Sequence, residues 1–95
     1  MMIIHLAYYS PEQYQLLLKY ADDRKKIDDK WEDWLVNFVK AKNGLSKEFT
    51  VREIYVDVEK MQQYFKSKKL KNTSKNRAAY VNEIGIDANK HESNN

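Results

Sequence analysis

The sequence predicts an α+β domain that is mostly helical, and three observations lead to this class. The chain has no glycine or proline between Pro11 and Gly44, and these two residue types most often interrupt a helix. Residues 49–56 are rich in β-branched and aromatic side chains, which is typical of a strand. A chain of 95 residues supports one core, so we expect a single domain over residues 1–86 and a flexible polar tail over residues 87–95.

The first expected elements are a short strand over residues 2–8 and a long helix over residues 11–43. The helix has a clear beginning, because Ser10 can accept a bond from the amide three residues on and Gln13 can bond back to it. Pro11 occupies the first helical position, where its missing N–H has no intrahelical partner to lose. The local pattern therefore defines where this helix begins.

An apolar stripe with heptad-like steps of three and four runs along the expected helix. A helix of this length would extend roughly 50 Å at about 1.5 Å per residue, which is too long for a compact domain of this size. It must either project and find a partner or fold back near its charged middle into a hairpin. We expect a coiled-coil homodimer, with two antiparallel core helices in one chain as the alternative. The predicted dimer seam is Ile27, Trp31, Trp34 and Phe38.

The second half of the chain is predicted to form a strand and two short helices. The strand, over residues 49–56, has no cleanly polar face, so it is expected to be covered on both sides. Its partner is either residues 2–8 or the same strand of a second chain. The helices are expected over residues 58–70 and 74–84, each behind a polar residue that can cap it. Gly85 is expected to end the second helix in the left-handed conformation.

Basic residues are concentrated in the segment 60–77. This segment has seven basic and no acidic residues, whereas the whole chain has a net charge of only +3. Such a segment attracts phosphate backbones, because neutralising the phosphates releases their counterions. The residues predicted to bind nucleic acid are Lys66, Lys68, Lys69, Lys71, Lys75 and Arg77.

These observations favour a small non-enzymatic protein that binds DNA or RNA, with a possible regulatory role, through a basic helix-turn-helix segment. The alternative is an adaptor or structural protein that docks onto a protein partner through the long helix and has no nucleic-acid role. In that case the lysines form a solvated face, which is a common use of such a run. The two interpretations differ in whether the lysines contact anything.

Residue types that carry chemistry are scarce. The chain has no cysteine, and its two histidines are His5 and His91. We therefore expect no catalytic residues, no metal site and no cofactor. The acidic residues in the middle of the expected helix alternate with lysines and do not indicate a cation site. The absence of cysteine fits a cytoplasmic location, and no apolar run approaches the roughly 20 residues that cross a membrane.

The order strand, helix, turn, helix over residues 51–84 resembles the ribbon-helix-helix DNA-binding module, in which paired strands from two chains enter the major groove. Two features depart from that module. Glu53 lies among the side chains that such a strand would present to DNA, and a long helix precedes the strand. The resemblance implies DNA binding by a dimer and assigns no role to individual residues.

Four segments carry a second resemblance: Ser10-Pro11-Glu12-Gln13-Tyr14, Trp31-Glu32-Asp33-Trp34, Tyr55-Val56-Asp57-Val58 and Ser74-Lys75-Asn76-Arg77. Through them most of residues 3–84 is similar to small uncharacterised bacterial proteins. This resemblance implies no activity.

Overall fold

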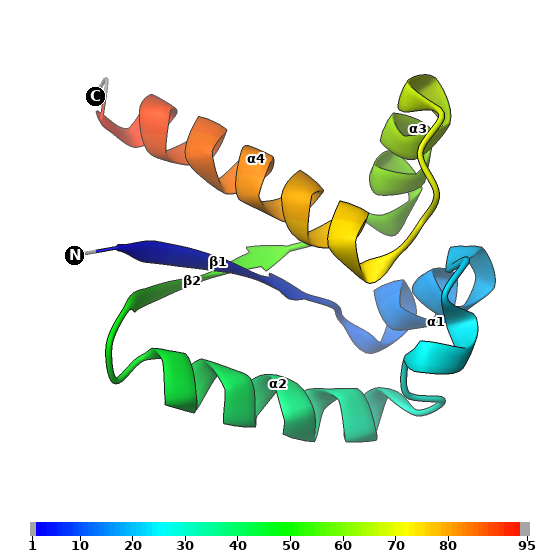
Figure 1. Ribbon diagram of the computed structural model, residues 1–95, viewed down its shortest axis with the longest axis horizontal. Helices are drawn as coiled ribbons and strands as arrows, with labels where there is room; N and C mark the ends of the chain where they lie inside the picture. Colours follow the sequence, from blue (N-terminus) through cyan, green and yellow to red (C-terminus); the bar gives the residue numbers. More distant parts are fainter. Residues whose placement is uncertain (1, 94–95) are drawn as a thin grey trace.

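Helices and two short strands make up the chain, as the predicted α+β class requires (Figure 1). The computed structural model describes residues 2–93, with side chains up to Asp87. The order of elements is β1 (Ile3–Tyr8), α1 (Pro11–Tyr20), the 3-10 turn η1 (Arg24–Lys26), α2 (Trp31–Leu45), β2 (Thr50–Tyr55), α3 (Val58–Lys68) and α4 (Ser74–Ser93).

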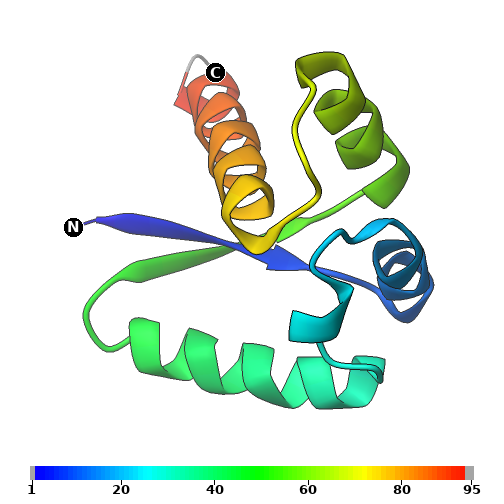
Figure 2. The ribbon, with the colours of Figure 1, turned by 45° about the vertical axis from the view of Figure 1, so that its right-hand side comes forward.

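The two strands form a parallel pair, with Ile3 opposite Thr50 and Tyr8 opposite Tyr55. Helix α2 lies along one face of the pair and α4 along the other (Figures 1 and 2). This arrangement answers the question that the sequence left open, because the partner of β2 is the first strand of the same chain. It also explains why neither face of β2 is cleanly polar, since parallel strands are normally covered on both sides.

The prediction of one long helix over residues 11–43 is wrong. Helix α1 ends at Tyr20, Ala21 is extended, and a short 3-10 turn precedes α2, which begins at Trp31. The longest dimension of the molecule is 36 Å, which is less than such a rod would need. The chain therefore folds back, as in the hairpin alternative.

Tertiary contacts explain why the helix breaks where it does. Asp22 and Asp23 lie in the break, and their carboxylates accept hydrogen bonds from residues at and just before the start of α4. The Tyr14 hydroxyl donates to the carbonyl oxygen of Asp28 at 2.5 Å, which fixes the loop between the two helices. Helix stability in proteins comes mainly from packing, so these contacts outweigh the absence of glycine and proline.

The helices after β2 begin where the sequence indicates. Asp57 caps α3, because its side chain accepts a bond from the Lys60 amide at 3.1 Å. Helix α4 begins at Ser74 but continues past residue 84 to Ser93, so Gly85 does not end it and has no positive φ. The side chains of the predicted tail beyond Asp87 lie outside the described part.

The main core lies where α1 and α3 pack together beside the carboxyl ends of the strands (Figure 1). Val81 joins it from α4. Within the described residues, no helix is long and apolar enough to cross a membrane. The buried members of the core are Tyr9, Tyr14, Leu17, Val56, Val58, Met61, Phe65 and Val81.

Candidate functional site

Five of the six residues predicted to bind nucleic acid are exposed at the end of α3, in the following loop and at the start of α4. Lys69 ends α3 in the left-handed conformation with φ 57°, and the amide of Leu70 then bonds to the carbonyl of Phe65 at 2.9 Å. Cations are favoured at this negative end of a helix. The exposed residues of this lysine cluster are Lys66, Lys68, Lys69, Lys71 and Lys75.

The loop that carries the lysine cluster is anchored by Asn72, which is 1% exposed. The backbone N–H of Asn72 donates to Asp22 Oδ2 at 2.7 Å, and the backbone N–H of Asp22 donates to the backbone carbonyl of Asn72 at 2.9 Å. The Asn72 side chain also donates to Gln62 Oε1 at 2.9 Å. Contacts to two other parts of the chain therefore fix the backbone that presents the lysines.

Arg77, the sixth predicted residue, is 7% exposed and points into the molecule. Its Nη1 donates to Asp23 Oδ1 at 2.9 Å and its Nη2 to Asp23 Oδ2 at 2.8 Å, and Nη1 also bonds to the side chain and carbonyl of Asn72. A guanidinium held in this way does not face solvent. Its assignment to phosphate binding is therefore corrected: Arg77 is a buried structural residue.

Asp23 also occupies the amino end of α4, because its Oδ2 accepts from the Ser74 amide at 3.0 Å. The hydrogen bonds from Arg77 hold the pKa of the Asp23 carboxyl below its ordinary value. A carboxylate at this position satisfies the positive end of the helix dipole. The start of α4 is consequently filled from within the chain.

The predicted dimer seam lies mostly inside one chain. Trp34 packs against Tyr8, Tyr9, Tyr14 and Phe38, with ring centroids 5.2–5.7 Å apart. Phe38 is buried. These contacts come from β1, from the residue that follows it, from α1 and from α2 itself, so the reason for a homodimer drawn from an uncovered stripe no longer holds.

The other two seam residues are half-buried against the same core. The Trp31 indole N–H donates to the Tyr9 carbonyl at 2.8 Å, and Ile27 follows the 3-10 turn. The docking rod that the adaptor alternative requires is absent from the described residues as well, because α1 and α2 are separate helices.

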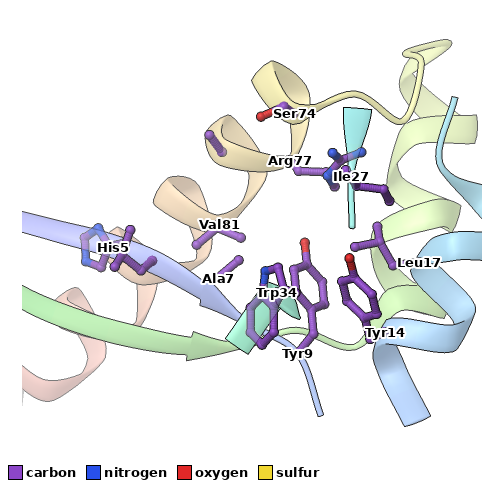
Figure 3. A pocket seen from close by; sticks show the side chains of 12 residues that line it. His5, Ala7, Tyr9, Tyr14, Leu17, Ile27, Trp34, Ser74, Arg77 and Val81 are labelled. Atoms are coloured by element: carbon purple, nitrogen blue, oxygen red, sulfur yellow. The ribbon is translucent and has the colours of Figure 1, made fainter. Parts of the chain in front are cut away.

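A partly open pocket of about 270 Å³ lies between β1, α1, α2 and the start of α4 (Figure 3). Its walls are mainly apolar, with Tyr9 and Tyr14 along one side and Arg77 at one end. The residues that line it are His5, Leu6, Ala7, Tyr9, Tyr14, Leu17, Ile27, Trp34, Ser74, Arg77, Ala78 and Val81.

Tyr9 is the most unusual residue of the pocket. It is 4% exposed, and its hydroxyl, with no hydrogen bond to another described residue, opens into the pocket. Burial raises the pKa of Tyr9 to about 12, so the hydroxyl is protonated at neutral pH and remains a donor. Sequence reasoning missed this residue, since its environment depends on four elements that are distant in the sequence.

His5 lies at the far end of the pocket, with its ring against Gly85 of α4. Its Nδ1 is 3.0 Å from Asn82 Oδ1, and its Nε2 is buried without a partner in the described part. Across residues 2–87, where side chains are described, no group of His, Cys, Asp and Glu is placed to hold a metal ion.

Comparison with known proteins gives no relative. The sequence matches no family model, and no curated protein or solved structure is significantly similar to it. The functional argument therefore depends on the residues themselves.

Proposed function

We propose that this protein is a non-enzymatic nucleic-acid-binding protein that contacts phosphate through the lysine cluster. The proposal includes DNA or RNA as the partner and a cytoplasmic location, which the lack of cysteine supports. One observation carries it: five lysines within ten residues are all exposed, in a segment without acidic residues.

The fixed loop strengthens this interpretation. Because Asn72 holds the loop to α3 and to the residues after α1, the lysine backbone does not have to be ordered when a ligand binds, which lowers the entropic cost of binding. Each phosphate that a lysine neutralises releases counterions, so affinity should fall steeply with salt. Lysine contacts of this kind carry little sequence information, and we expect weak base specificity.

The experiment is a fluorescence-anisotropy titration with a labelled single-stranded and a labelled duplex oligonucleotide. With five lysines engaged, the logarithm of the affinity should fall against the logarithm of the salt concentration with a slope of about −4.5 for the duplex and about −3.5 for the single strand. No anisotropy change at micromolar protein in low salt, with either oligonucleotide, would overturn the proposal.

A matched pair of triple variants separates local charge from overall charge. Lys68→Glu/Lys69→Glu/Lys71→Glu should abolish binding while the circular dichroism spectrum is unchanged. The control replaces three exposed lysines outside the cluster and makes the same change in net charge. Equal loss of binding in the two variants would contradict a localised site. The control variant is Lys25→Glu/Lys40→Glu/Lys47→Glu.

A further inference from the structure

We propose that the pocket beside Tyr9 binds a small, flat and largely apolar molecule through a carbonyl or carboxylate oxygen. The lysine cluster does not line this pocket. The inference is therefore independent of nucleic-acid binding and stands or fails separately.

The unpaired Tyr9 hydroxyl is the first reason. The hydroxyl is open to the pocket and is not sealed in the core, since His5 Nε2 is the one fully buried side-chain nitrogen or oxygen without a partner in the described part. Tyr9 is 4% exposed, and its hydroxyl points toward the end of the pocket where Arg77 lies (Figure 3). A ligand oxygen in this space can therefore accept a hydrogen bond from the Tyr9 hydroxyl.

Two further donors belong to residues that line the same pocket. The indole N–H of Trp34 and the Nε–H of Arg77 have no partner among the described residues. Figure 3 shows the indole nitrogen on the same side of the aromatic cluster as the Tyr9 and Tyr14 hydroxyls. The unpaired groups at the Arg77 end of the pocket are donors, so a ligand must place an acceptor at that end. At the far end His5 Nε2 is unpaired, and it is an acceptor when Nδ1 donates to Asn82 Oδ1.

The walls define the rest of the ligand. Ala7, Leu17, Ile27 and Val81 provide apolar surface, which favours a hydrocarbon or aromatic body. A volume of about 270 Å³ lies just below the usual range for small-molecule pockets, about 300–1,000 Å³, so a single-ring compound is the appropriate size. The pocket also adjoins the carboxyl end of β1, where ligands of parallel sheets commonly bind.

The charge of the pocket leaves two sources for the oxygen. Arg77 is already paired with Asp23 at 2.8 Å, so the positive charge of the guanidinium is largely balanced. A neutral carbonyl can therefore accept hydrogen bonds from these donors without electrostatic repulsion. A carboxylate would be attracted by Arg77 and repelled by the nearby Asp23. These two oxygens share the same recognition chemistry, and direct titration distinguishes them.

The experiment titrates ¹⁵N-labelled protein with acetophenone, benzoate and toluene and follows the backbone amide shifts. Acetophenone, benzoate or both should shift the amides of Tyr9, Trp34 and Arg77, and toluene should bind at least about fivefold more weakly because it has no acceptor. The stronger of the first two identifies the preferred oxygen. Equal binding of all three compounds, or no shifts at these amides, would overturn the proposal.

Tyr9→Phe tests the hydroxyl directly. It should reduce the affinity for the oxygen-bearing probe to that for toluene. Because the hydroxyl has no partner among the described residues, the same substitution should leave the unfolding midpoint nearly unchanged. Unchanged probe affinity in this variant would remove Tyr9 from the site.

Two adjacent alanines of α4 provide a matched control that leaves the core intact. Ala78 lines the pocket and Ala79 does not, and both are exposed. Ala78→Leu should narrow the pocket and weaken probe binding at least about fivefold, whereas Ala79→Leu should have no effect. If both variants bind the probe like the wild type, the shifts do not arise from this pocket.

Discussion

The guanidinium of Arg77 holds both carboxylate oxygens of Asp23, a residue 54 positions earlier, at 2.8 and 2.9 Å. Both side chains are nearly buried, with exposed fractions of 8% and 10%. The pair joins the break between α1 and α2 to the start of α4. It thus connects the two halves of the chain beside the pocket and next to the lysine loop.

Removing one member of this pair should be strongly destabilising, because the other charge is left buried without a partner. We expect Asp23→Asn and Arg77→Met each to lower the free energy of unfolding by about 3–5 kcal/mol. The double variant should cost less than the sum, since it leaves no lone charge. Urea denaturation measures all three, and a loss below about 1 kcal/mol in both single variants would contradict the pair's structural role.

The same pair predicts a dependence of stability on acid. The Arg77 hydrogen bonds lower the pKa of Asp23 in the folded protein. The stabilisation is therefore complete above the ordinary carboxyl pKa, about 3.9, and is lost as the pH falls through the lowered value. Urea midpoints measured below about pH 5 should fall more steeply for the wild type than for Asp23→Asn. Parallel curves would show that this carboxyl titrates normally.

The two glycines should respond in opposite ways to alanine. Gly44 lies in α2, where an added Cβ would meet nothing within 4 Å, so Gly44→Ala should stabilise the protein by about 0.5–1 kcal/mol. A Cβ on Gly85 would overlap the His5 ring, so Gly85→Ala should destabilise it by about 1–3 kcal/mol. Thermal unfolding tests both, and adding His5→Ala should recover part of the second loss.

Trp34 provides a test of where the predicted seam lies. Its ring packs against four aromatic side chains of its own chain, so Trp34→Ala should lower the free energy of unfolding by about 2–4 kcal/mol. The loss should be the same across an about hundredfold range of protein concentration, because a shared seam would make stability concentration-dependent. A midpoint that rises with wild-type concentration would instead indicate that subunits associate.

Local signals predicted the beginnings of α1, α3 and α4, but not that of α2, which has no side-chain cap. Ser10 caps α1, accepting from the Gln13 amide at 3.2 Å, and Asp57 caps α3 as expected. Capping depends on a few adjacent residues, and for that reason it is visible in the sequence. The composition of residues 49–56 likewise predicted β2 to within one residue at each end.

Long-range contacts account for what the sequence did not predict. At the break after Tyr20, Asp23 bonds to Arg77, 54 positions later, and at Gly85 the ring of His5 lies where a larger residue would place its Cβ. In the sequence Arg77 is one more basic residue beside the lysines. Its burial, which separates it from them, is visible only in the fold. The apolar stripe is interrupted at Arg24, within the charged segment 22–30, and this interruption was the available signal for the break.

The parallel pairing of β1 with β2 has a consequence for biosynthesis. Strand β1 leaves the ribosome before its partner Thr50–Tyr55, so the sheet cannot close until α1 and α2, which lie between the two strands, have been translated. Until then the Ile3–Tyr8 segment offers an unpaired backbone edge to chaperones or to other nascent chains. A fragment that stops before Thr50 keeps that edge open, and we expect it to be degraded or to aggregate.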